Sequence, residues 1–151
     1  MSEDFADAFN ARPADGWVRA MGLRFVRATA DEVVAEWTIG PEHRQAYGIV
    51  HGGVHCGVIE TLVSVGAALF AQRNGQSVVG LDNHTSFVRA VREGTLRATA
   101  TPITRGRRTQ LWEGVVVGAD GKTVATGRVR LLCLDADADL AGKKVDRGFG
   151  P

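Results

Sequence analysis

The chain has 151 residues, the usual length of one domain, and can bury roughly two thirds of the surface that its unfolded form exposes. Its 18 basic and 17 acidic residues give a formal net charge of +1, which argues against a nucleic-acid-binding protein held by bulk electrostatics. The two cysteines, Cys56 and Cys133, lack partners at metal-ligand spacing, and the N-terminus is acidic where a signal peptide is basic and then apolar. We therefore expect a soluble, cytoplasmic protein with no disulfide and no nucleic-acid partner.

The N-terminal third is predicted to hold short elements and one hairpin. Residues 1–15 are expected to form an N-terminal arm or a short helix, followed by a brief helix through Trp17 and Met21. Apolar and polar residues then alternate, as in strands that bury one face, over 23–28 and 32–39. A polar loop over 40–50 leads into the next element, and such loops often carry binding groups.

The stretch from His51 to Gln72 predicts a long, buried helix, since it is long enough for six turns of about 3.6 residues each and is apolar nearly all round. Its histidines, glycines and one glutamate make it a poor membrane span. On a helical wheel its aliphatic side chains form two flanks. Between them runs what we call the small-residue strip: Gly53, Gly57, Glu60, Ser64 and Ala67.

Glu60 is the only acidic or basic side chain of this helix apart from two histidines. It is either a structural carboxylate paired with an arginine, or a catalytic or ligand-binding group, because carboxylates are rarely buried unless paired or functional. Ser64 lies one turn later, within side-chain reach. The exposed N–H groups at the helix start, His51 to Gly53, favour a developing negative charge.

Four further strands are predicted after the helix, over 78–88, 96–104, 110–117 and 123–134, followed by an extended or disordered tail over 135–151. The predicted order in one domain is two strands, a long helix and then four strands. This order indicates an α+β fold, in which a largely antiparallel sheet covers the helix. A sheet covers only part of a helix, so the small-residue strip needs another cover. A homodimer with the site at or near its interface is the economical hypothesis.

The sequence offers little support for a metal or a serine nucleophile. His51 and His55 are four residues apart and could share a helical face, but no glutamate follows either one as in the H-E-x-x-H zinc motif. No serine lies in a G-x-S-x-G elbow. We expect neither a metal nor a cofactor.

The order of elements and the run from Tyr47 to Val54, YGIVHGGV, with Glu60 seven residues after Gly53, resemble the hotdog-fold acyl-CoA thioesterases. The closest resemblance is to the PaaI-like group and the Arthrobacter-type 4-hydroxybenzoyl-CoA thioesterases. It covers residues 16–134, which it implies are one hotdog domain, with an antiparallel sheet wrapped around one long central helix. Many PaaI-like proteins carry Asp at the helix carboxylate, so Glu60 favours an aromatic acyl-CoA.

The resemblance implies roles for several residues. Glu60 is the nucleophile or the general base, and the Gly52 backbone N–H polarises the thioester carbonyl. Gln45 orients the thioester or the water. Ser64 occupies a position held by threonine in the Arthrobacter-type enzyme, and its hydroxyl is expected to orient Glu60 or the water. His51 matches the motif histidine, which we expect to anchor the loop rather than to act as a base.

CoA carries phosphates, so basic surface groups are expected to receive it. The candidates for substrate or CoA binding are Gly53, Asn83, Thr85, Arg89, Arg105, Arg107 and Arg108. The alternative interpretation of the arginines is that they belong to a solvated turn and bind no phosphate. The alternative for Asn83 and Thr85 is that they support the helix and do not contact substrate.

The sequence therefore predicts a thioester hydrolase that converts an aromatic, hydroxybenzoyl-type acyl-CoA to the free acid and CoA, as a homodimer and, by resemblance, a homotetramer. A PaaI-like thioesterase for phenylacetyl-type or medium-chain acyl-CoA is the enzymatic alternative. A non-catalytic acyl-CoA-binding module is the alternative from another class.

Overall fold

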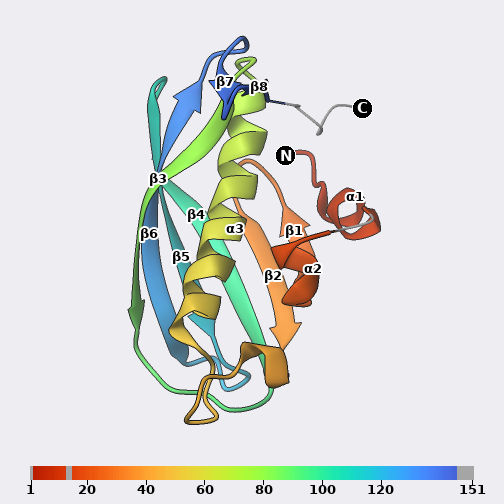
Figure 1. Cartoon of the computed structure of the whole chain (residues 1–151), viewed down its shortest axis with the longest axis vertical. Helices are drawn as coiled ribbons and strands as arrows, with labels where there is room; N and C mark the ends of the chain where they lie inside the picture. The colour runs from red at the N-terminus through yellow and green to blue at the C-terminus, as the bar shows by residue number, and fades with distance from the viewer. Residues whose placement is uncertain (1, 13–14, 146–151) are drawn as a thin grey trace.

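One antiparallel sheet of six strands curves around a single long helix, α3, in the computed structural model (Figure 1). The structure describes residues 2–12 and 15–145. The strand order is β1-β2-β4-β5-β6-β3. The strands are β1 (Arg24–Ala28), β2 (Val33–Thr38), β3 (Ser77–Phe87), β4 (Thr95–Arg105), β5 (Thr109–Val117) and β6 (Thr123–Leu134). The helices are α1 (Ala6–Ala11), α2 (Trp17–Ala20), the 3₁₀ turn η1 (Pro41–His43) and α3 (Gly52–Gln72).

This arrangement confirms the predicted hotdog architecture, and each predicted strand lies within two residues of its observed bounds. Buried and more exposed residues alternate along the whole of β5 and over residues 125–131 of β6, where one sheet face packs on α3. Periodicity could therefore locate these strands, because the other face is open to solvent.

The sheet side of α3 is closely packed. Val58, Leu62 and Val63 are fully or almost fully buried. A Cβ on Gly66 would lie 2.6 Å from the ring of Trp112, so the glycine lets this buried indole contact the helix directly. By length and composition α3 could cross a membrane, but its packing against the sheet identifies it as the core helix of the domain.

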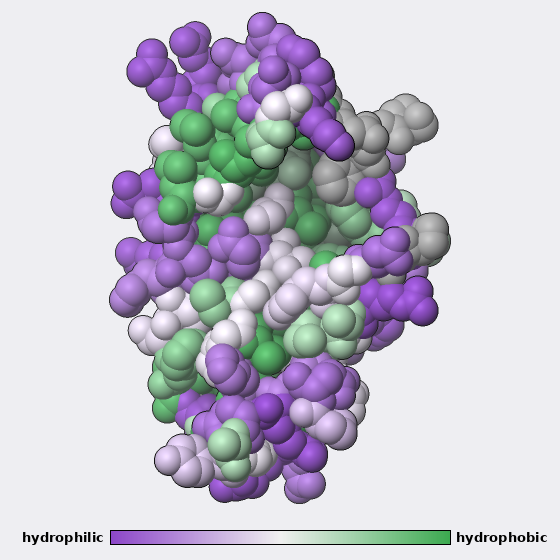
Figure 2. Space-filling view, in the orientation of Figure 1, coloured by the Kyte–Doolittle hydropathy of each residue, from purple (hydrophilic) through white to green (hydrophobic). Residues whose placement is uncertain are grey.

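The opposite side of α3 carries the small-residue strip. Gly57, Glu60 and Ser64 are partly exposed and Gly53 is exposed, whereas Ala67 is fully buried, so the strip is open only from Gly53 to Ser64. Figure 2 shows this side of the molecule, with weakly polar, pale surface along the course of α3 in Figure 1.

β3 is an edge strand of the sheet. β6 pairs with one of its edges over ten residues, and no described strand pairs with the other. Large apolar side chains are exposed on or beside it: Leu81 is 53 % exposed, Phe87 61 % and Val88 57 %. Long, apolar, unpaired edges invite pairing with another chain.

The N-terminal segment is part of the packed domain rather than a free arm. Asn10 donates a hydrogen bond to the Phe25 carbonyl (2.8 Å) and accepts one from its N–H (2.9 Å), so α1 covers the outer edge of β1. Asp4 likewise accepts from the N–H of Ala28 at 2.9 Å. These bonds occupy backbone groups that an edge strand would otherwise expose.

The C-terminal segment differs from the prediction. An extended or disordered tail was expected from residue 135, but Asp139–Leu140 (β7) and Lys143–Lys144 (β8) pair as a small antiparallel hairpin. Gly142, with φ of +78°, supplies the left-handed conformation that its turn needs. The expected tail over residues 146–151 lies outside the described residues.

Candidate active site

The start of α3 is held by the loop that precedes it. The side chain of His51 caps the helix, its Nδ1 accepting the Gly53 N–H at 2.8 Å. The His51 N–H donates to the carbonyl of His43 at 2.8 Å, and the buried His43 ring accepts from Gly40 N–H through Nδ1 at 2.8 Å. His51 therefore caps the helix through its side chain and joins the loop through its backbone. The Gly52 N–H, the first of the helix, donates to no described residue.

A cavity of about 400 Å³ opens at this helix start. Gln45, Gly52 and Gly53 line it together with His51 and His55, and residues 87–90 form the opposite wall. The Gln45 side-chain oxygen already accepts the N–H of Tyr47, which leaves its amide NH₂ as a donor toward the cavity. The structure thus brings together the loop and helix-start residues that the sequence singled out.

Phe87 covers this helix start. A Cβ on Gly52 would lie 2.5 Å from the Phe87 ring, so only glycine lets the aromatic ring approach so closely. The ring is itself largely exposed. Phe87 therefore borders the start of the helix within one chain.

Glu60 lies against β3. One carboxylate oxygen accepts a hydrogen bond from Asn83 Nδ2 at 2.9 Å, and Thr85 in turn donates to Asn83 Oδ1 at 2.7 Å. Asn83 also donates to the Cys56 carbonyl at 3.1 Å, which fixes the amide against the helix. The interpretation of Glu60 as the ion-pair partner of an arginine does not hold among the described residues, since Glu60 forms no salt bridge there.

The other carboxylate oxygen of Glu60 lies over Gly80. A Cβ at that position would come within 2.6 Å of it, and the strand has a register irregularity between Gly80 and Asp82. Glycine inside a strand often marks such a close approach. Ser64, expected to orient Glu60, is not among the donors to this carboxylate in the described part of the chain.

Glu60 and Gly52 are well separated along α3. They are eight residues apart, which at about 1.5 Å per residue is about 12 Å of helix. Neither Glu60 nor Ser64 lines the cavity at the helix start. Within one chain the predicted nucleophile and the predicted oxyanion donor cannot reach the same carbonyl.

His55 is a buried histidine in the wall of the cavity. It is 3 % exposed, its Nδ1 has no hydrogen-bond partner within the described residues, and its ring lies 6.4 Å from those of Trp37 and Phe87. Burial lowers the pKa of His55 from 6.5 to about 4, because the charged imidazolium would lose its hydration. His51 and His55 therefore differ in environment. Within residues 2–12 and 15–145 no group of three or more His, Cys, Asp or Glu residues is placed to hold a metal ion.

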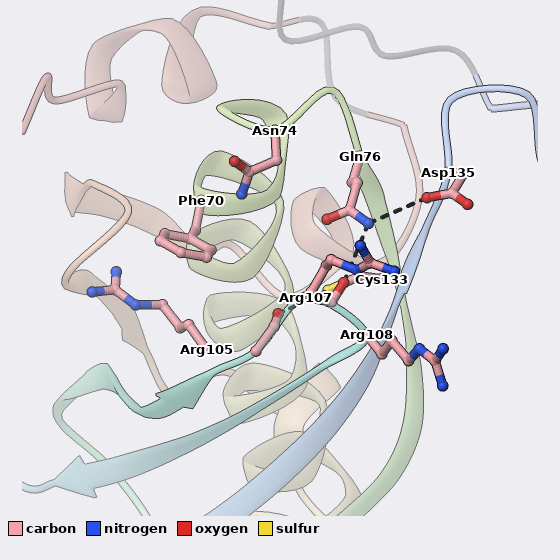
Figure 3. Close-up of a pocket in the computed structure, with 9 residues that line it drawn as sticks. Phe70, Asn74, Gln76, Arg105, Arg107, Arg108, Cys133 and Asp135 are labelled. Carbon is pink, nitrogen blue, oxygen red and sulfur yellow. Dashed lines mark hydrogen bonds between the residues drawn. The ribbon is translucent and has the colours of Figure 1, made fainter.

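A second, larger cavity of about 740 Å³ lies at the far end of α3 (Figure 3). Arg105, Arg107 and Arg108 all line it, as do Gln76 and Cys133 among others. Figure 3 shows that the side chains of Arg105 and Arg108 point in different directions. These three of the arginines predicted to bind CoA therefore share a cavity but not a common orientation.

Arg105 is held by neighbouring residues. Its guanidinium donates to the carbonyl of Ala30 and to Asp31 Oδ1, both at 2.8 Å, and its Cζ lies 4.4 Å from the centroid of the Phe70 ring. No described residue pairs with the side chains of Arg107 and Arg108, which are exposed. Only these two remain open basic groups in the cavity.

Arg89 lies apart from the other three arginines. It lines the cavity at the helix start and forms two hydrogen bonds to Asp120, at 2.8 and 3.0 Å. Hydrogen bonds from the Lys122 N–H and from Arg89 lower the pKa of the Asp120 carboxyl. Arg89 therefore belongs to a surface ion pair beside the helix start.

Sequence reasoning missed several contacts at this site. Gly80 makes room for the Glu60 side chain, and Gly57 makes room for the Trp17 side chain. A glycine inside a strand or a helix is the sequence signal that could have predicted these two contacts. His55 was considered only as a zinc ligand. No sequence signal pairs Asn83 with Glu60, since that contact depends on how β3 crosses the helix.

The site and fold have clear counterparts among known proteins. Residues 47–125 match the sequence profile of the thioesterase superfamily. A Mycobacterium tuberculosis protein named as an esterase is 40 % identical over 118 residues, which are 77 % of this chain and 84 % of that one, and its solved structure superposes with a TM-score of 0.78 over 80 % and 98 % of the two chains. The proofreading thioesterase EntH of Cronobacter sakazakii is 32 % identical over 85 % of this chain and 93 % of that one.

A thioesterase structure from Haemophilus influenzae has a TM-score of 0.80 at 28 % identity, covering 86 % of this chain and 90 % of that one. The fold and the relatives together define a hotdog-fold thioester hydrolase. This chain belongs to the thioesterase superfamily.

The buried His55 predicts a pH dependence of stability. Its folded-state pKa of about 4 lies below the ordinary value of 6.5, so the unfolded chain binds the proton more tightly. The stability that the neutral ring contributes is complete above pH 6.5 and is lost as the pH falls toward 4. The loss is roughly 3 kcal/mol in the free energy of unfolding.

Urea unfolding of the wild type and of His55→Leu, from pH 7 to pH 4, measures this effect. Because the leucine cannot titrate, the variant should lose less stability than the wild type over this range. Parallel curves for the two proteins would show that His55 is not held neutral by burial.

Proposed function

We propose that the protein hydrolyses an aromatic, hydroxybenzoyl-type acyl-CoA to the free acid and CoA, with Glu60 as nucleophile or general base. The single observation that carries the proposal is the environment of Glu60: a carboxylate on the accessible strip of an apolar helix, with one oxygen held by Asn83. A carboxylate that accepts from a neutral amide and pairs with no described cation remains free to act as a base or nucleophile.

The chemistry needs few groups because a thiolate leaves readily. In one route Glu60 attacks the thioester carbonyl, the C–S bond breaks to release the CoA thiolate, and water then hydrolyses the resulting anhydride. In the other, Glu60 takes a proton from water as the water oxygen attacks, and the proton passes to the departing thiolate. Both routes place negative charge on the carbonyl oxygen, where an N–H donor such as Gly52 lowers the barrier.

We infer that each site contains Glu60 of one chain and Gly52 of a second copy. About 12 Å of helix separates the two residues within a chain. A two-fold axis that pairs the exposed edges of two β3 strands in antiparallel fashion would also set the two α3 helices antiparallel. The helix start of each copy would then approach the Glu60 of the other.

The contacts of β3 support a specific register for this pairing. Glu60 lies beside Gly80 and Asn83, and Gly52 lies beside Phe87, about five residues further along the strand. This register requires Phe87 of the partner subunit to lie opposite residues 80–82. The two-fold axis must then pass close to His84, which is midway between these positions along the strand. This pairing would cover the exposed Leu81 and Phe87 side chains.

The assembly and compartment extend the same proposal. A homodimer is the minimal unit, and the resemblance to the Arthrobacter-type enzymes implies a homotetramer. We place it in the reducing cytoplasm, where its two cysteines stay free. The reaction as proposed uses a carboxylate, a backbone donor and water, so we assign it no cofactor beyond the CoA of the substrate.

Two alternatives make different predictions. Phenylacetyl-type or medium-chain acyl groups would be the substrates if the enzyme resembles the wider PaaI-like group. The relatives of this chain include one protein named as an esterase and one named as a proofreading thioesterase. A non-catalytic acyl-CoA-binding module would retain CoA esters without turnover.

Release of free thiol from a panel of aromatic and straight-chain acyl-CoAs tests the activity and its acyl preference. Glu60→Ala is expected to lower kcat by at least about a hundredfold, since it removes the group that attacks or activates water. Ser64→Ala, one turn away on the same strip, is the matched control and should lower kcat much less. If Glu60→Ala hydrolysed the esters at the wild-type rate, the catalytic assignment of Glu60 would be wrong.

The Gly52 N–H can be deleted without changing the helix register. Proline is tolerated at the first helical position, and His51, with φ of −65° and ψ of 133°, already has the extended conformation that precedes proline. Gly52→Ala introduces the same Cβ beside Phe87 but keeps the donor. Gly52→Pro should therefore have a kcat about 10²-fold to 10³-fold below that of Gly52→Ala. Equal kcat values in the two variants would show that this N–H does not stabilise the oxyanion.

The open basic groups of the larger cavity are proposed to receive CoA phosphates. Arg107→Ala with Arg108→Ala should raise KM several-fold at low salt and leave kcat nearly unchanged, because the phosphates lie far from the reacting bond. Arg97→Ala, which removes an arginine already paired with Glu36, is the control. An unchanged KM in the double variant would place the phosphate contacts elsewhere.

A further inference from the structure

Trp17 has no role in the chemistry described above, yet its indole lies directly on the small-residue strip. A Cβ built on Gly57 would lie 2.5 Å from Cζ2 and 2.7 Å from Cη2 of Trp17, so only a glycine leaves room for the ring. Trp17 is 39 % exposed, whereas Trp37 and Trp112 are at most 2 % exposed. Trp17 is thus a surface aromatic placed on α3 rather than a part of the core.

The indole lies close to Glu60. Gly57 precedes Glu60 by three residues, on the same face of the helix and about 4.5 Å away along its axis. Successive helical residues are 100° apart, so Glu60 points between Cys56 on one side and Gly57 on the other. The Cys56 carbonyl accepts a hydrogen bond from Asn83 of β3. Helix geometry therefore places the carboxylate between β3 on one side and the indole of Trp17 on the other.

The segment that carries Trp17 is anchored to the loop before α3. Helix α2 lies between two glycines in the left-handed region, Gly16 (φ +85°) and Gly22 (φ +64°). At its end the Met21 carbonyl accepts a hydrogen bond from Nε2 of the buried His43, at 2.8 Å. That loop also carries Gln45, so the position of the indole is tied to the residues that form the helix-start cavity.

We propose that Trp17 is a specificity-determining residue, whose indole forms one wall of the acyl pocket and packs against the ring of an aromatic acyl group when the thioester lies at Glu60. The inference rests on the proposed function and deepens it. Paired aromatic rings attract each other beyond the burial of their surface, and a flexible alkyl chain does not obtain this extra attraction. An indole at this position therefore favours a planar acyl group.

Hydrolysis of 4-hydroxybenzoyl-CoA and hexanoyl-CoA by Trp17→Ala and Trp17→Phe tests the selectivity. Trp17→Ala should lower kcat/KM for the aromatic ester by up to about tenfold and change the hexanoyl ester much less, whereas Trp17→Phe, which keeps a ring, should retain most of the preference. An equal loss for both esters would mean that Trp17 only supports the fold. No change for either would mean that the acyl group does not touch it.

Gly57→Ala tests the same contact without removing the ring. The added Cβ displaces the indole, while alanine favours the helix more than glycine does, so the fold should be retained. The selectivity should shift toward hexanoyl-CoA, as in Trp17→Ala. Phe9→Ala removes another N-terminal aromatic, one that packs on Phe25 at 5.3 Å, and should leave the selectivity unchanged. Wild-type selectivity in Gly57→Ala would overturn the proposal.

A binding measurement separates this inference from the proposed reaction. The thioethers S-benzyl-CoA and S-hexyl-CoA cannot be hydrolysed, and their dissociation constants for the wild type and Trp17→Ala can be measured by calorimetry. The wild type should prefer the benzyl ligand, and Trp17→Ala should lose that preference about tenfold. If no acyl-CoA is hydrolysed but this preference is found, the reaction is wrong and the Trp17 contact stands. If esters are hydrolysed and Trp17→Ala keeps the benzyl preference, the Trp17 contact is wrong.

Discussion

The hydrogen bond from Asn83 to Glu60 joins the central helix to the edge strand of the sheet. A carboxylate on an otherwise apolar helix needs such a partner, because removing it from water without one would cost several kcal/mol. Asn83 supplies a neutral donor, so the carboxylate is oriented without being paired to a cation. Thr85 and the Cys56 carbonyl fix the amide in turn, and Gly80 leaves room for the second oxygen. The position of β3 and the chemistry of the helix therefore depend on each other.

Much of the fold could be predicted because each element carries a regular pattern. The strands alternate, and the apolar stretch from His51 to Gln72 is too long and uninterrupted to be anything but a helix. Glu60 stood out for a related reason, as a single charge on that helix. The N-terminal residues were harder to interpret, since their order comes from the bonds of Asp4 and Asn10 to β1 and not from a local pattern.

The details of the site depended on contacts between distant segments. Arg105 and Arg107 look alike in the sequence, but only Arg105 meets Asp31 and Phe70, because β4 ends beside the first hairpin and the last turns of α3. Asn83 could have been a substrate ligand or a support, and the register of β3 against α3 decided that it contacts Glu60. Gly52 and Glu60 lie in one motif, yet the helix rise separates them by about 12 Å.

That separation makes the second copy of the chain the central claim about the site. Co-expression of Glu60→Ala and Gly52→Pro chains with different affinity tags, followed by tandem purification, yields the mixed dimer. If Glu60 of one chain acts with Gly52 of its partner, one site of the mixed dimer carries both defects and the other carries neither, so thiol release should recover to about half of the wild-type rate. Activity no higher than that of the two parent variants would contradict a shared site.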